Sequence, residues 1–226
     1  MAAPTTGGTG FDPVRYLNGA LWNGELMSFP IQSGYANNIS KGDPVIVGKP
    51  DTINPGYCLN LADFAKGTFP TPAPASQAAA PIFGVFIGCS YQTAPALNPM
   101  DPASPARIFW PTGTVTLDSA DATAFICVDP QVVYRAKTNA LVNVLTGAAR
   151  LKYASAAVPT TGGIADVSSS GTSVAYVDTG AIAFVPTALN VRILGLSDYP
   201  NNAWSNLNPY VDVIFENIYF GGRSAA

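Results

Sequence analysis

The chain has 226 residues, of which 48% are hydrophobic and only 11% charged, and its formal net charge is −3. The charged fraction is low, since typical soluble domains contain about 25% charged residues. Disorder needs low hydrophobicity together with high charge, so the composition argues against a disordered chain and predicts a folded one. The 11 lysines and arginines form no basic stripe, which argues against nucleic-acid binding, and no apolar run approaches the roughly 20 residues of a membrane span.

So few charges favour association with other surfaces. Two interpretations fit: an extracellular protein with a Ser/Thr/Asn surface, or a subunit largely covered by its neighbours, which the composition favours. The start, MAAPTTGGTGFDPVRY, lacks the positive and apolar regions of a signal peptide, so we expect synthesis in a cytoplasm without export by that route. The three cysteines have no CxxC spacing, which predicts neither a disulfide framework nor a zinc site.

Residues 1–24 predict an extended N-terminal arm. A Gly/Thr-rich start is followed by three isolated aromatic residues, Phe11, Tyr16 and Trp22. Aromatic side chains on a flexible segment need another surface to bury them, and ends of this composition fray unless something holds them. We therefore expect the arm to lie across a neighbouring subunit.

Residues 25–146 predict a main β-domain. A strand near Ser28 is followed by a turn at residues 41–43 and by a strand over 44–47. The apolar run 81–91 contains two glycines, at 84 and 88, and this spacing indicates a bend or bulge, as at a barrel corner. Further strands are predicted in 107–117 and 122–130, a mixed helix or strand in 131–151, and Pro-rich surface loops in 64–81 and 92–106.

Residues 147–226 predict a smaller C-terminal β region. Small polar residues over 154–180 indicate strands joined by a Gly/Ser loop, and 188–220 reads as strand, turn and strand. The alternation in YVDVIFENIYF is typical of a half-buried strand. The predicted fold is all-β, with an antiparallel barrel or sandwich core, an extended N-terminal arm and long Pro/Gly-rich loops.

The sequence contains no histidine, which removes Ser/His and Cys/His nucleophile pairs and histidine-based metal sites. Ser173 lies in GTSVA, which resembles a nucleophile elbow only loosely, and a disordered loop serine is the favoured interpretation. Glu25 and Glu216 are the only glutamates, and nothing places either beside a catalytic partner. The aspartates at 118, 121 and 129 do not fit a calcium loop. We therefore expect no catalysis, metal or cofactor.

The aromatic residues leave a choice between a sugar-stacking platform and packing. Trp204, in NNAWSNLNPY, is the best platform candidate, although a core or interface role is favoured. The Phe109-Trp110-Pro111 step reads as the anchor that returns the 92–106 excursion to the core. The residues expected to contact a capsid or another subunit are Phe11, Tyr16, Trp22, Met100, Phe109, Trp110, Trp204 and Tyr210.

Several segments taken in order resemble the head decoration (cement) proteins of tailed bacteriophages. They are SFPIQSGYANNISKGDPVIV, PIFGVFIGCSYQ, RIFWPTGTV, ATAFICVDPQVVYRAKTNA and NVRILGLSDYPNNAWSNLNPYVDVIFENIYF. The resemblance covers most of residues 28–220 and implies a non-enzymatic virion protein on the outer capsid surface. It would bind the major capsid protein, stabilise the head and act as a homotrimer or as single copies at capsomer junctions. The alternative is a carbohydrate-binding or fibre- or tail-associated virion protein that contacts host glycans.

Overall fold

The computed structural model describes residues 9–48, 56–61, 63, 82–93, 107–139, 155–158, 173–183 and 190–216. The loop predicted at 64–81, most of the one at 92–106 including Met100, and the helix alternative beyond residue 139 lie outside these residues. Within them the fold is all-β, as predicted, and every pairing within a sheet is antiparallel.

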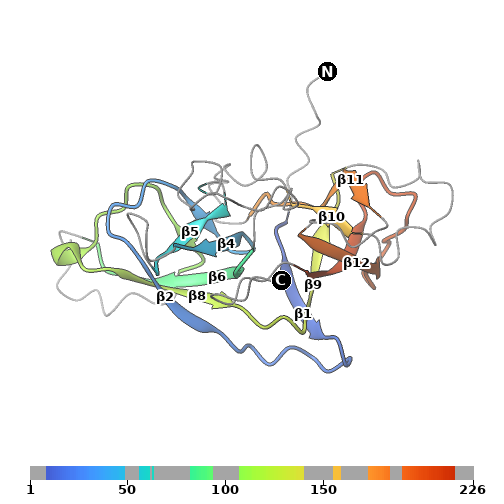
Figure 1. Cartoon of the computed structure of the whole chain (residues 1–226), viewed down its shortest axis with the longest axis horizontal. Coiled ribbons are helices and arrows are strands. Elements are labelled where there is room, and N and C mark those ends of the chain that lie inside the picture. The colour runs from blue at the N-terminus through green and yellow to red at the C-terminus, as the bar shows by residue number, and fades with distance from the viewer. Residues whose placement is uncertain are drawn as a thin grey trace, which may run out of the picture.

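The described strands form one short sheet and two large open sheets, and the large sheets lie side by side (Figure 1). One has the order β1 (Asp12–Tyr16), β9 (Val132–Lys137), β13 (Tyr210–Phe215), β12 (Val191–Leu196), β10 (Ser155–Ala157) and β11 (Asp178–Ala183). The other has the order β2 (Met27–Ile31), β8 (Ala122–Cys127), β6 (Gly84–Ser90), β4 (Pro44–Val47) and β5 (Cys58–Asn60). A short third sheet pairs β3 (Ile39–Ser40) with β7 (Phe109–Trp110), and η2 (Leu117–Ser119) is a single 3₁₀ turn. No barrel closes among the described strands, so of the two predicted cores the sandwich is the compatible one.

The turn at residues 40–43 joins the parts of the fold, and its location was predicted. Asp43 N–H donates to the Ser40 carbonyl at 2.9 Å, and Gly42 has a φ of +91°, a conformation that glycine adopts without strain. Other backbone groups of the turn form hydrogen bonds with both larger sheets. Phe11 N–H donates to the Gly42 carbonyl at 2.9 Å, and Gly42 N–H donates to the Phe86 carbonyl at 2.8 Å. The turn therefore ties the strands of both larger sheets together.

Strand β6 contains the predicted irregularity. Its register with β8 shifts between Phe86 and Gly88. A Cβ at Gly88 would lie 2.7 Å from the Arg107 carbonyl oxygen. The close approach of the Arg107 backbone therefore requires glycine at position 88. Cys89 and Arg107 exchange backbone hydrogen bonds of 2.7 and 2.6 Å. The bulge thus marks the point to which the chain returns at Arg107.

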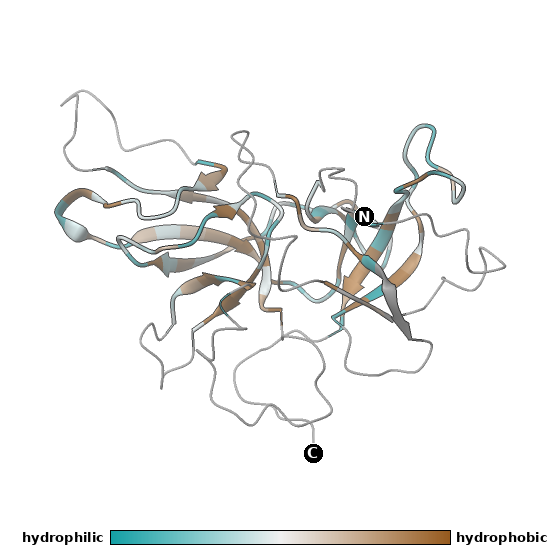
Figure 2. Ribbon diagram, turned by 90° about the horizontal axis from the view of Figure 1, so that it is seen from above, coloured by the Kyte–Doolittle hydropathy of each residue, from teal (hydrophilic) through white to brown (hydrophobic). Residues whose placement is uncertain are grey.

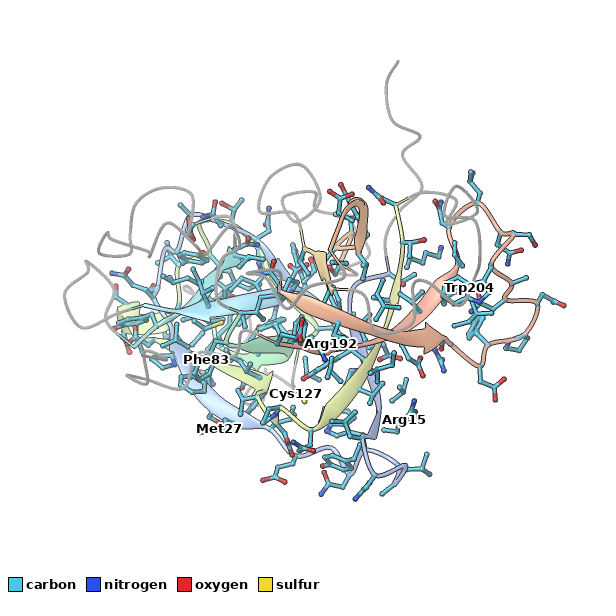
Figure 3. All side chains as sticks on the ribbon, turned by 45° about the vertical axis from the view of Figure 1, so that its right-hand side comes forward. Arg15, Met27, Phe83, Cys127, Arg192 and Trp204 are labelled. Carbon is cyan, nitrogen blue, oxygen red and sulfur yellow. The ribbon has the colours of Figure 1, made fainter. Side chains whose placement is uncertain are left out.

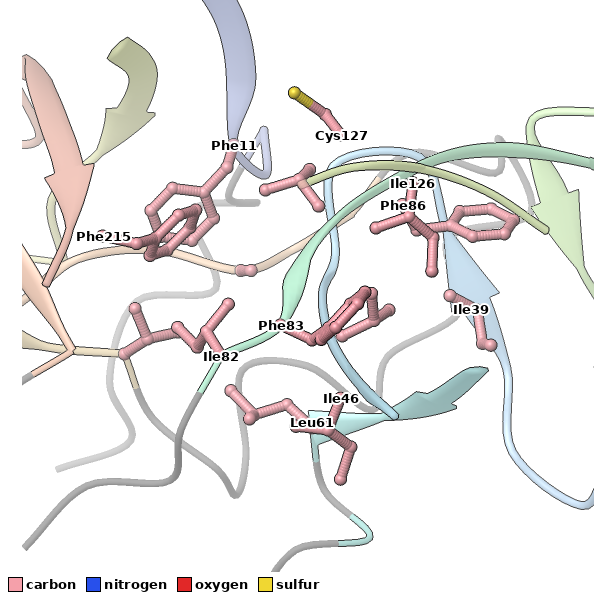
Figure 4. Packing of buried hydrophobic residues seen from close by; sticks show 14 of the residues in the cluster. Phe11, Ile39, Ile46, Leu61, Ile82, Phe83, Phe86, Ile126, Cys127 and Phe215 are labelled. Carbon is pink, nitrogen blue, oxygen red and sulfur yellow. The ribbon is translucent and has the colours of Figure 1, made fainter. Parts of the chain in front are cut away.

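One hydrophobic cluster runs through both sheets. Phe11 lies against Phe215 with ring centroids 5.2 Å apart, and Phe215 lies 4.9 Å from Tyr134. Figure 4 shows the Phe11 and Phe215 rings beside Ile82, which belongs to the chain leading into β6. In Figure 2 the hydrophobic residues concentrate on the strands of both sheets. The two sheets therefore share a core.

The structure corrects two parts of the predicted organisation. Residues 12–16 form an edge strand paired with β9, and Phe11 and Tyr16 pack against the chain's own core, so this part of the predicted arm belongs to the fold. The predicted boundary between 25–146 and 147–226 also divides a sheet, since β9 pairs directly with β13. Strand pairing across such long sequence separations leaves no local signal.

Candidate functional site

Exposed apolar side chains concentrate in one segment. Four of the eight large hydrophobic side chains that are exposed among the described residues lie between positions 17 and 27. They are Leu17, Leu21, Leu26 and Met27, with exposed fractions of 40, 83, 37 and 47%, and we call them the N-terminal strip. The segment runs along one margin of the molecule from β1 to β2 (Figure 1). A concentration of this kind marks interaction surfaces more often than scattered single residues do.

Local hydrogen bonds hold the first part of this segment. Tyr16 N–H donates to the Ala20 carbonyl at 2.8 Å, and the Tyr16 hydroxyl donates to Asn23 Oδ1 at 2.6 Å. Trp22 packs, half buried, against the core. Because Tyr16 and Trp22 are held against the chain itself, the turn leaves the side chains of Leu17 and Leu21 exposed.

The second part of the strip begins an edge strand. Met27 pairs with Ile126 of β8, and β2 has no further neighbour in the described sheet. Pro30 lies in the same strand, and a proline removes one donor from an edge. The strip is thus continuous with an open sheet edge.

A cavity of about 380 Å³ lies where the 40–43 turn meets β1, β9 and β13. We call it the junction cavity. Its charged lining side chains are Asp12, Lys41 and Arg135, and its aromatic ones are Phe11, Tyr199 and Tyr210. The rings of Tyr199 and Tyr210 are 4.9 Å apart, and Tyr199 is 46% exposed.

Arg135 is held in place from two sides. Its Nε donates to Ser197 Oγ at 2.7 Å, and its guanidinium lies 5.2 Å from the Tyr199 ring centroid. Asp212 is its cross-strand neighbour, but that carboxylate pairs with Arg15 at 3.2 Å. Neither Arg135 nor Lys41 forms an ion pair with a carboxylate in the part of the chain that the structure describes. The cavity is therefore lined by two cations that have no carboxylate partner among the described residues.

A buried carboxylate lies next to the same turn. Asp43 is 2% exposed, and its Oδ2 accepts a hydrogen bond from Ser40 N–H at 2.7 Å. Burial raises the pKa of Asp43 to about 7, although the Ser173 hydroxyl and Ser40 N–H favour the charged form. Ser173 itself is 1% exposed and its N–H donates to the Lys41 carbonyl at 3.0 Å. The prediction of a disordered loop serine is therefore wrong: Ser173 is a buried residue of the junction.

The residues predicted to contact a capsid or another subunit differ in how deeply they are buried. Phe11 and Trp110 are 1% and 0% exposed, so the prediction that their side chains contact another subunit is corrected, because this chain's own core encloses them. Trp110 packs edge-on against Tyr91, with ring centroids 4.9 Å apart, in keeping with its predicted role as an anchor. Four others, Tyr16, Trp22, Phe109 and Trp204, are half buried.

Tyr210 is the one predicted residue that lines the junction cavity with its side chain still partly exposed. Lys41, Arg135 and Tyr199 were not singled out, because they come from three distant segments and only the fold brings them together. Cys89 and Cys127 are fully buried, and burial raises the pKa of the Cys89 thiol to about 12.

The described residues contain neither a cluster of metal ligands nor a membrane-spanning helix. They contain no group of three or more acidic or cysteine side chains placed to hold a metal ion. None of their helices has the length and hydrophobicity needed to cross a membrane.

Comparisons with known proteins also returned no match. No family model matches the chain, and no curated protein or solved structure is significantly similar to it.

Proposed function

We propose that this protein is a bacteriophage capsid decoration protein. In this proposal it binds the outer face of the major capsid protein lattice, stabilises the head without catalysis and assembles with copies of itself as a trimer. The observation that carries the proposal is the N-terminal strip, which places four exposed apolar side chains within eleven consecutive residues. The low charge content and the resemblance of several segments to cement proteins support the same function.

The strip is large enough to matter for binding. Burial of a leucine or methionine side chain contributes about 1.5–3 kcal/mol in transfer terms before ordering costs. The four residues are already displayed by a hydrogen-bonded turn and an edge strand, so little ordering is needed when they dock. Repetition around a symmetric shell then multiplies modest contacts through avidity.

Co-sedimentation with capsids that lack the protein tests this proposal. The wild-type protein is expected to bind in stoichiometric amounts and to raise the temperature at which the particles release DNA. Leu21→Asp should bind much more weakly, because it places a charge in the most exposed position of the strip.

Leu207→Asp is the matched control. Leu207 is 59% exposed and lies in the same turn as Trp204, which Figure 3 places far from Met27. This variant should bind capsids as the wild type does. Absence of capsid binding by the wild-type protein would refute the proposal, and equal loss in both variants would refute the role of the strip.

A further inference from the structure

The junction cavity has the features of a small-molecule site that is separate from the N-terminal strip. Its volume of about 380 Å³ lies at the lower end of the range of about 300–1,000 Å³ for ligand pockets. This size suits a ligand of one or two rings better than a peptide segment. Its walls combine aromatic rings with a few polar groups, as ligand pockets do.

The charges of the cavity favour an anion. Lys41 and Arg135 contribute two positive charges and Asp12 contributes one negative charge, which leaves the lining with an excess of +1 in a chain whose net charge is −3. Arg135 is fixed by Ser197, while Lys41 occupies an exposed turn position. A carboxylate placed between them would form charge-assisted hydrogen bonds, which are stronger than neutral ones.

The aromatic wall specifies the rest of the ligand. Tyr199 lines the cavity and is 46% exposed, and its ring packs against the Tyr210 ring, with centroids 4.9 Å apart, and against the Arg135 guanidinium 5.2 Å away. A half-exposed ring held in place can stack against the flat CH face of a sugar, and its hydroxyl can bond to sugar hydroxyls. A uronic acid carries such a face and a carboxylate on one ring.

We propose that the junction cavity binds an acidic saccharide, with a uronate carboxylate between Lys41 and Arg135 and the sugar ring on Tyr199. The site differs from the earlier expectation of a platform at Trp204, which packs half buried against the core. It shares no residue with the N-terminal strip, so it is independent of capsid binding.

Isothermal titration calorimetry with digalacturonate as the probe tests the proposal. The expected result is saturable binding of digalacturonate in the millimolar range, about tenfold weaker binding of the neutral disaccharide galactobiose, and none of acetate. Absence of digalacturonate binding, equal affinity for galactobiose, or tighter binding of a tetraglutamate peptide would overturn it.

Charge variants locate the binding. Lys41→Gln and Arg135→Gln should each weaken digalacturonate binding about tenfold, and Asp12→Asn should strengthen it several-fold. Lys137→Gln is the matched control: it removes a cation two residues from Arg135 on the same strand, but Lys137 does not line the cavity. Lys41 and Asp12 are exposed, so these variants keep the test decisive even if Arg135→Gln fails to fold.

Ring variants separate stacking from hydrogen bonding. Tyr199→Ala should weaken binding about tenfold, whereas Tyr199→Phe should keep most of it, because the ring remains. Unchanged affinity in both Tyr199→Ala and Lys41→Gln would place the saccharide elsewhere and overturn the proposal.

Discussion

At the scale of single residues, Asp43 is a buried carboxylic acid in the turn that joins the two larger sheets. Its pKa is raised from 3.8 to about 7 by burial. Between pH 3.8 and about 7 the Asp43 carboxyl keeps its proton in the folded protein but releases it in the unfolded chain. The free energy of unfolding therefore falls as the pH rises through this range. Above about pH 7 the folded state must hold a buried charge.

We therefore predict that Asp43 lowers the free energy of unfolding by up to about 1.4 kcal/mol per pH unit as the pH rises from 4 to 7. Asp43→Asn, which stays neutral, should lack this contribution. Urea unfolding of both proteins at several pH values measures it as the difference between their slopes. Parallel stability curves over this range would show that Asp43 titrates normally.

Gly10 tests the close packing at the same junction. A Cβ there would lie 2.6 Å from Ser173 Cβ and 2.8 Å from the Gly42 carbonyl oxygen, and the φ of Gly10 is +70°. Gly10→Ala should lower the free energy of unfolding by about 2–3 kcal/mol. Gly24→Ala is the control, because Gly24 has a φ of +82° with open space around it, and it should cost only about 1 kcal/mol. Equal losses would mean that backbone strain alone, without the clash, decides the effect.

At the scale of elements, Trp110 shows how a single side chain fastens β7 to the core. It is fully buried against Tyr91, and its Nε1 has no hydrogen-bond partner among the described residues. Trp110→Ala should lower the free energy of unfolding by about 3–5 kcal/mol. Trp110→Phe should cost clearly less, since it keeps an aromatic ring and loses no hydrogen bond. Chemical denaturation of both variants provides the measurement, and similar losses in the two would contradict packing as the cause.

The same elements show what the sequence could predict. Local patterns in the sequence predicted the Ser40–Asp43 turn, the bulge in β6, the strand Pro44–Val47 and the anchoring role of Trp110, because glycine, proline and apolar residues mark each of them. The pairing of β1 with β9 was missed, and Phe11 was assigned to an arm, because non-local pairing has no signature in either strand. The junction cavity was missed for the same reason.

At the scale of the whole molecule, the shared core predicts cooperative unfolding. Phe11, Phe215 and Tyr134 pack together, and the cluster continues through Ile82 toward β6. We expect one thermal transition in which calorimetric and van't Hoff enthalpies agree. Phe11→Ala should move the whole transition to lower temperature. Two separate transitions, with only one of them shifted, would indicate that the two sheets fold independently.

The proposed assembly depends on one surface, the N-terminal strip, and a cryo-electron microscopy reconstruction of the decorated particle tests it most directly. We predict density for this protein on the outer face of the capsid, with residues 17–27 buried against a neighbouring subunit or the capsid lattice. A reconstruction in which these residues face solvent while another surface makes the contacts would contradict the proposed role of the N-terminal strip.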